Sequence, residues 1–195
     1  MKKSLKYTLL TIPNKLQVDV KAIVEDTGIL ASEYISPTKE FVALKLYPLI
    51  TLSIVRPYEM DESGVRRRLN WSPNDSLPLT KYTLPVFLKE FLDIKKDMEI
   101  KELYSYIGNR LELNENLAEK ITKKFKVGNN YVELTPVVIS LLDDTRVEGI
   151  KLKINNEEST VLLTVNDIES LAFTLTNSQF DLIVINLFKM YKGIK

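Results

Sequence analysis

Apolar and polar residues alternate through much of the first 80 residues, as they do in strands that bury one face. In the segment 17–24 every second side chain is apolar and those between are mostly polar, which predicts a half-buried β-strand. The segment 41–55 is longer and rich in β-branched and aromatic residues. Because proline cannot donate to a central ladder, Pro48 predicts two strands here, or one strand bent at that residue. The apolar face of the first segment consists of Val18, Val20, Ala22 and Val24.

The apolar spacing changes to a helical period in the middle of the chain. A first helix has apolar residues at i, i+3, i+4 and i+7, which form one buried face. Thr83 is its expected cap, and Pro85 is tolerated in its first turn. Two more helices are expected near residues 98–107 and 115–126, the second capped by Asn114. The face of the first helix consists of Leu84, Phe87, Leu88 and Phe91.

Strand-like spacing returns between Tyr131 and Thr164. A helix is expected to follow, with Asn166 as its cap and Glu169 as the partner in a capping box. The last segment, 180–191, is apolar on nearly every side, so we expect its helix in the core or at a contact between subunits. Strands, helices, strands and helices in this order predict an α+β fold.

The two strand zones resemble each other at an offset that drifts from 88 to 84 residues. Leu46–Ile50 aligns with Leu134–Val138, and Gly64–Asn70 aligns with Gly149–Asn155. Similar segments at a nearly fixed spacing are typical of duplication. Chance similarity between amphipathic strands is the alternative explanation. The alignment continues with Leu79-Thr80 on Leu163-Thr164, and with the first helix face on Ile168, Leu171, Ala172 and Leu175.

The duplication predicts a single domain, residues 1–195, made of two pseudo-repeated antiparallel sheet-plus-helix units. The units are expected at about 1–94 and 127–195, with a helical insertion, 95–126, between them. In each unit several antiparallel strands would be followed by one helix packed across the sheet.

Three consecutive arginines lie inside the first of the aligned strands. Alternation places Arg66, Arg68 and Asn70 on one face of that strand, and Arg67 and Trp71 on the other. Because the residue aligned with Arg67 is aliphatic, a buried Arg67 would need a partner. The outward side chains of the aligned strand are Lys151, Lys153 and Asn155.

A sheet face with these cations and amides suits a sugar-phosphate backbone. Arginine binds phosphate through paired hydrogen bonds, lysine supplies charge, and asparagine bonds a base edge or a phosphate. Aromatic side chains such as Trp71 and Tyr131 can stack on unpaired bases. The sequence therefore predicts binding of single-stranded nucleic acid, with DNA as the expected form. A solvated sheet face, with Trp71 in the core, is the alternative. The predicted site is Arg66, Arg68, Asn70, Trp71, Lys151, Lys153 and Asn155.

The segments GVRRRLN and GIKLKIN are each followed by Leu-Thr and an amphipathic helix. In this order of segments the chain resembles the Whirly and PUR-repeat class of single-stranded nucleic-acid-binding proteins. The resemblance is topological and covers about residues 41–92 and 131–176. It implies a duplicated sheet and helix, strands of nucleic acid bound across the sheet, and a homo-oligomer.

Composition narrows the chemistry. The chain has no cysteine and no histidine, which excludes disulfides and thiolate metal sites and removes the commonest zinc ligand and general base. No phosphate-cradling glycine loop is present. We therefore expect no enzymatic activity, no cofactor and no metal.

No run of about 18 apolar residues occurs, and the first 17 residues lack a signal-peptide core, so we expect a cytoplasmic protein outside the membrane. The net charge is +1, so a nucleic-acid site must be a local patch.

Two other functions are open. Residues 99–126 could form a helix-turn-helix that binds duplex DNA. The chain could instead be a protein-interaction module, as an accessory factor or inhibitor. Its composition is compatible with a phage or mobile element. The helix-turn-helix would place near the DNA Lys120, Lys123, Lys124 and Lys126.

Overall fold

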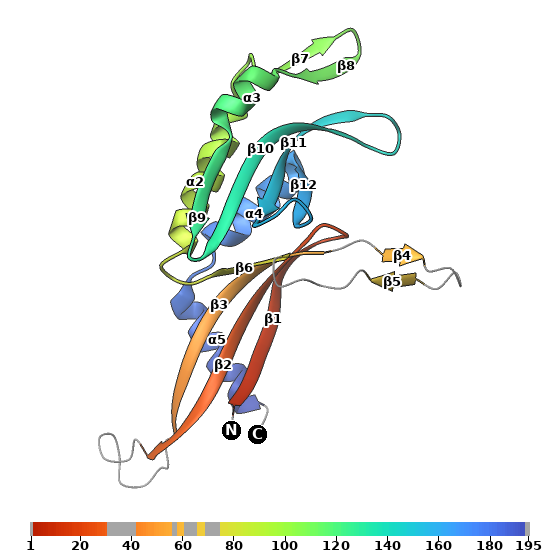
Figure 1. The fold of residues 1–195 in the computed structure, drawn as a ribbon. Coiled ribbons are helices and arrows are strands. Elements are labelled where there is room, and N and C mark those ends of the chain that lie inside the picture. The colour runs from red at the N-terminus through yellow and green to blue at the C-terminus, as the bar shows by residue number, and fades with distance from the viewer. Residues whose placement is uncertain (1, 31–41, 56–57, 61–65, 69–74, 194–195) are drawn as a thin grey trace.

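The structure, a computed structural model, describes the backbone of residues 2–30, 42–55, 58–60, 66–68 and 75–193. These residues form two four-stranded antiparallel sheets, two short hairpins and four helices (Figure 1). The predicted α+β fold class is confirmed.

The first sheet is built from the N-terminal part of the chain. Its inner face is apolar where side chains are described, because every second residue of β2 from Leu16 to Ala22 is buried, as the alternation predicts. A separate hairpin of β4 (Tyr58–Met60) and β5 (Arg66–Arg68) lies between its last two strands in the sequence. In order across it, the sheet contains β1 (Lys2–Ile12), β2 (Leu16–Leu30), β3 (Val42–Ile54) and β6 (Ser76–Leu79).

Pro48 lies inside one continuous strand and does not divide it. In β3 it pairs with Ala22 of β2. On the other side of β3, β6 pairs only with Ile50–Ser53. Among the described residues the strand therefore has one neighbour at Pro48, and a residue without an N–H is tolerated at such an edge position.

The second sheet is built from the C-terminal half. Its four strands are β9 (Lys123–Val127), β10 (Asn130–Ser140), β11 (Arg146–Ile154) and β12 (Thr160–Thr164), in the order β12-β11-β10-β9. The alternation predicted for 149–155 is confirmed, because Ile150, Leu152 and Ile154 are all fully buried. The side chains between them must then point to the opposite face.

Helices cover the inner faces of both sheets and join them in one core. α2 (Leu84–Asp97) follows the first sheet in the sequence but packs on β9 and β10 of the second. α4 (Val165–Thr176) packs on β11, β12 and β1, and α5 (Phe180–Gly193) packs on β1 and β3. The rings of Phe87 and Phe91, both fully buried, lie 5.6 Å apart. Each sheet is therefore covered partly by a helix that lies far from it in the sequence.

The segment between the two sheets differs from the predicted pair of helices. The helix expected at 98–107 is wrong, because a hairpin of β7 (Tyr104–Ile107) and β8 (Arg110–Leu113) lies there. Its Gly-Asn turn with Gly108 at φ 60° favours a hairpin between aromatic and β-branched residues. The helix expected at 115–126 ends early. It is α3 (Glu115–Ile121), capped by the Asn114 side chain as predicted, and the chain then enters β9.

The residue alignment behind the predicted duplication holds at its end. Leu79 and Leu163 both lie near the end of the last strand of a sheet, and a helix follows each. The alignment of Gly64–Asn70 with Gly149–Asn155 is wrong, because β5 pairs with β4 among the described residues whereas β11 is a central strand of the second sheet. The duplication itself stays a prediction.

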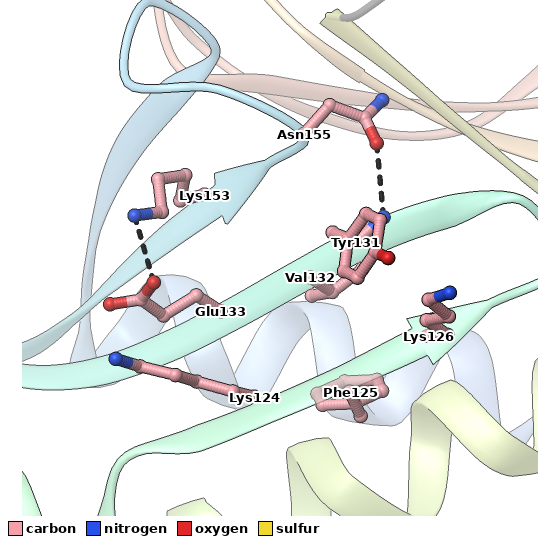
Figure 2. A pocket seen from close by; sticks show the side chains of 8 residues that line it. All are labelled: Lys124, Phe125, Lys126, Tyr131, Val132, Glu133, Lys153 and Asn155. Carbon is pink, nitrogen blue, oxygen red and sulfur yellow. Dashed lines mark hydrogen bonds and ion pairs between the residues drawn. The ribbon is translucent and has the colours of Figure 1, made fainter.

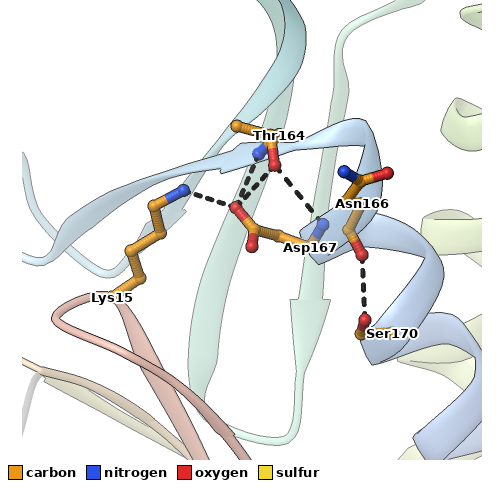
Figure 3. A network of polar contacts seen from close by, with 5 residues as sticks. All are labelled: Lys15, Thr164, Asn166, Asp167 and Ser170. Carbon is orange, nitrogen blue, oxygen red and sulfur yellow. Dashed lines mark hydrogen bonds and ion pairs between the residues drawn. The ribbon is translucent and has the colours of Figure 1, made fainter. Parts of the chain in front are cut away.

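A capping box starts α4 two residues earlier than the one predicted with Asn166 and Glu169. The Thr164 side chain accepts from the backbone N–H of Asp167, and the Asp167 carboxylate accepts from the backbone N–H of Thr164. Asn166 accepts the Ser170 hydroxyl through its backbone oxygen instead (Figure 3). The box fixes the Asp167 side chain at the start of the helix.

Two polar contacts join the parts of the chain that form the two sheets. Lys15, in the turn between β1 and β2, donates to Asp167 at 2.5 Å (Figure 3). The Ser159 hydroxyl donates to the Asp75 carboxylate at 2.8 Å, and both residues are fully buried. Because each contact spans more than 80 residues of sequence, both help to fix the two sheets relative to each other.

Candidate nucleic-acid interface

The second sheet has a polar face that points away from α2 and α4, the outer face. Its position follows from burial, because Val132, Leu134, Ile150 and Leu152 alternate with its residues and lie in the core with those helices. It carries cations from two strands and one exposed aromatic ring. Its polar residues include Lys124, Lys126, Tyr131, Glu133, Thr135, Lys151, Lys153 and Asn155.

Strand register brings these residues together from three strands. Lys126 of β9 lies opposite Tyr131 of β10, and Lys124 lies opposite Glu133. On the other side of β10, Glu133 lies opposite Lys153 of β11. Side chains directly opposite each other on one face are in contact distance, so the outer face forms one continuous cluster.

The cluster surrounds an open cavity of about 620 Å³. Figure 2 shows the side chains of Lys124, Lys126, Tyr131 and Lys153 on the near side of the sheet, with helices behind it. A volume of this size suits a small ligand or one part of a larger one. The remaining lining residues are Phe125, Val132, Glu133 and Asn155.

Lys153 is neutralised by two carboxylates. Its Nζ lies 2.8 Å from Glu133 Oε2 and 2.5 Å from Glu157 Oε1, and only 19% of its side chain is exposed. The hydrogen bond from Lys153 lowers the pKa of Glu133, and the two carboxylates raise the pKa of Lys153. The predicted binding residue Lys153 is therefore held in an ion-pair cluster.

The other three lysines of the outer face provide its net positive charge. Among the described residues, no carboxylate lies within ion-pair distance of Lys124, Lys126 or Lys151. Lys124 and Lys126 are exposed and Lys151 is half-buried. These three ammonium groups can bind an anionic ligand without first breaking an ion pair with a carboxylate.

Tyr131 provides an aromatic surface beside these cations. Its side chain is 58% exposed, which is large for an aromatic residue in a sheet. Lys126 Nζ lies 4.5 Å from the centroid of its ring, a cation–π contact that holds both side chains in place. A flat ring next to an unpaired cation matches the needs of a nucleotide, with its base and its phosphate.

Asn155 has a structural role that its predicted role did not include. It adopts φ 62°, a conformation that asparagine tolerates better than most residues. Its Oδ1 accepts from the backbone N–H of Tyr131 at 3.0 Å, and its Nδ2 donates to Asn130 Oδ1 at 3.0 Å. The amide therefore fastens the end of β11 to the start of β10.

Two other predicted residues, Arg66 and Arg68, lie on a strand outside the second sheet. Arg66 and Arg68 lie on β5, opposite Met60 and Tyr58. That hairpin is separate from the second sheet and projects from the first (Figure 1). The structure describes only the backbone of Arg66 and Arg68. Asn70 and Trp71 lie outside the described residues.

The predicted helix-turn-helix is wrong. Lys123, Lys124 and Lys126 lie on strand β9, and only Lys120 lies on a helix. Lys124 and Lys126 instead belong to the outer face. Because the sequence predicts a helix for them, the predicted sheet site does not include them. The alternation of charged and apolar residues in 124–127 is compatible with a strand, but the segment is too short to exclude a helix end.

Within the described part of the chain, no cluster of three acidic side chains could hold a metal ion, and no helix is long and apolar enough to cross a membrane. Comparisons of the chain with protein-family models, with characterised proteins and with solved structures found no match.

Proposed function

We propose that the protein binds single-stranded nucleic acid on the outer face of its second sheet. The observation that carries the proposal is the open cavity lined by the exposed Tyr131 ring and by Lys124 and Lys126, which have no ion-pair partner among the described residues. Lys151 lies outside the cavity on the same face. The surface combines residues of β9, β10 and β11. The lysines of β9 and β11 lie on the same face because both strands pair with β10, one on each side.

The chemistry divides between charge and stacking. Lys124, Lys126 and Lys151 contact backbone phosphates, and each displaces a counterion in doing so. A base stacks on the ring of Tyr131, a contact worth about 1–3 kcal/mol. Lys126 Nζ lies 4.5 Å from the centroid of that ring, so it can contact the phosphate that adjoins the stacked base.

Single strands are favoured over duplexes for a geometric reason. A base can lie flat on Tyr131 only if it is not stacked and paired inside a helix. The site also lies on a sheet and not on a helix that could enter a major groove. Stacking on Tyr131 is open to every base, so we expect little sequence preference.

Fluorescence polarisation with a labelled single-stranded oligonucleotide tests the proposal. At about 50 mM salt the wild type should bind the single strand more tightly than the matching duplex. The variant Lys124→Ala with Lys126→Ala should weaken binding by about tenfold or more. Loss of two phosphate contacts should also reduce the slope of log affinity against log salt by roughly 1.4, at about 0.7 for each contact.

A matched control removes the same charge from another surface. Lys96 and Lys101 are exposed, and neither belongs to the second sheet. The variant Lys96→Ala with Lys101→Ala should keep the wild-type affinity and salt slope within about twofold. It removes only charges outside the proposed site, and salt screens their effect on the bound strand. Equal weakening by both double variants, or no binding by the wild type at low salt, would contradict the proposal.

A further inference from the structure

An apolar cluster is exposed at one end of the second sheet, away from the outer-face cavity. The β7–β8 hairpin and the β10–β11 turn meet there, and Arg146 donates to the backbone oxygen of Leu111 at 3.4 Å. Leu142 is fully exposed and Tyr106 is 72% exposed. Exposed apolar groups that lie together mark interaction sites more often than scattered ones do. This end patch consists of Tyr106, Leu141, Leu142 and Val165.

Leu142 projects from a turn of fixed conformation. The backbone N–H of Leu141 donates to the oxygen of Thr145 at 2.8 Å, and that of Asp144 donates to Leu141 at 3.1 Å. The Asp143 carboxylate accepts from the backbone N–H of Thr145 at 3.1 Å. A turn held by three hydrogen bonds presents its apolar tip with little loss of conformational entropy when a partner binds.

A cavity of about 450 Å³ lies beside this turn. Its walls come from β7 and β8, from the residues around the β10–β11 turn, and from the start of α4. A cavity of this size accommodates a leucine side chain together with its neighbours. The patch therefore contains both a protruding apolar side chain and a recess. The lining residues are Tyr106, Leu111, Leu141, Arg146, Val147, Glu148, Thr164, Val165 and Asn166.

Charges at the protrusion and at the recess are complementary. Asp143 and Asp144 follow Leu142 directly and are exposed. Arg146 lines the recess, and no carboxylate of the described residues is within ion-pair distance of it. The recess also contains Glu148. Burial and the negative charge of Glu148 raise the pKa of Tyr104. An acidic tip that enters a recess beside Arg146 gains an ion pair at the rim.

We propose that the end patch binds a second copy of this chain, with Leu142 of each copy in the recess of the other. A surface that carries both a protrusion and its recess is self-complementary, which a twofold dimer requires. An unrelated partner would need to supply both shapes and the complementary charges. The dimer contact lies outside the outer-face cavity, because the two cavities share no lining residue.

Sedimentation velocity over about 1–200 µM protein tests the dimer. The wild type should shift from monomer to dimer with rising concentration, and Leu142→Asp should stay monomeric throughout. Leu182→Asp is the matched control, because it changes a leucine that is also exposed but lies on α5, and it should dimerise as the wild type does. A wild type that is monomeric at 200 µM, or a Leu142→Asp variant that still dimerises, would overturn the proposal.

A second set of variants tests the charge pair without disturbing the turn. Asn replaces Asp144 well at its φ of 62°, and methionine keeps the apolar stem of Arg146. Asp144→Asn and Arg146→Met should each weaken dimerisation by about threefold to tenfold. The double variant should be little weaker than either single variant, because both remove the same contact. Two independent, additive effects would contradict the contact across the interface.

Discussion

Lys15 Nζ lies 2.5 Å from the Asp167 carboxylate, which also accepts the backbone N–H and the hydroxyl of Thr164. One carboxylate therefore caps a helix of the second half and holds a turn of the first. Burial raises the pKa of Asp167, but the hydrogen bonds from Lys15 and Thr164 outweigh it, so its pKa lies below the ordinary value.

The variant Lys15→Met should lower the free energy of unfolding by about 1 kcal/mol, because it removes one partly buried charged hydrogen bond and keeps the apolar stem. Urea unfolding at pH 7 measures the loss. A lowered folded-state pKa stabilises the fold above the unfolded pKa of about 3.9, and this effect is lost as the pH falls through the folded-state pKa. The difference between wild type and variant should therefore become smaller as the pH falls below about 3.9. A difference that stays constant from pH 7 to pH 3 would show that the ion pair does not cause it.

Tyr131 should be replaceable by phenylalanine but not by alanine. The proposed contact is stacking, which needs the ring and not the hydroxyl. Tyr131→Ala should therefore weaken single-strand binding by about fivefold to a hundredfold, which corresponds to about 1–3 kcal/mol. Tyr131→Phe should bind within about twofold of the wild type. Polarisation titrations of both variants, with the same oligonucleotide and salt, measure the difference. Equal losses in both variants would assign the effect to the hydroxyl and remove the stacking contact.

The sequence predicts the elements best where a long stretch repeats one period. The alternation in β2 and β11 and the apolar face of α2 are visible without tertiary information. Between residues 104 and 127 each element is only four to seven residues long, so no single period of apolar residues repeats often enough to identify it. In 123–127, KKFKV fits a helix end and a strand equally well in isolation. Pairing with β10 decides between them, and no local pattern shows that pairing.

The candidate site could be predicted only in part for the same reason. Alternation places Lys151, Lys153 and Asn155 on one face, and the structure agrees. It does not show that Lys153 is held by Glu133 and Glu157, or that the amide of Asn155 is used within the sheet. Those contacts depend on which strands are neighbours. The separate β4–β5 hairpin likewise follows from strand pairing, which a match of residue types cannot establish.

Gly149 should not tolerate a side chain. A Cβ at this position would overlap Ile139 Cδ1 and lie 2.5 Å from the backbone oxygen of Leu163, so a neighbouring strand would have to move. Gly149→Val should lower the free energy of unfolding by about 3 kcal/mol. Gly128→Asn is a fitting control, because Gly128 has φ 60° and open space around it, and asparagine tolerates that conformation. Urea unfolding should show a loss below about 1 kcal/mol for the control. Similar losses at both glycines would contradict the packing argument.

Removal of the charge of Glu133 should strengthen nucleic-acid binding. Glu133 is one of the two carboxylates that hold Lys153, and it also lies opposite Lys124, so Glu133→Gln leaves Lys153 with Glu157 alone and removes the repulsion between Glu133 and phosphate. Affinity for the single strand at about 50 mM salt should rise about threefold to tenfold. The lowered pKa of Glu133 keeps it ionised at neutral pH, so the gain should be the same from pH 6 to pH 8.

Lys153→Ala provides the opposite test of the same cluster. Because two carboxylates already neutralise Lys153, its removal leaves Glu133 and Glu157 without their partner and adds repulsion. Binding should weaken, whereas Lys153→Ala combined with Glu133→Gln should return it close to the wild-type affinity. Polarisation titrations of the four proteins complete the cycle. If Glu133→Gln bound no better than the wild type, or the double variant bound as weakly as Lys153→Ala, the result would contradict a bound phosphate near Glu133 and Lys153.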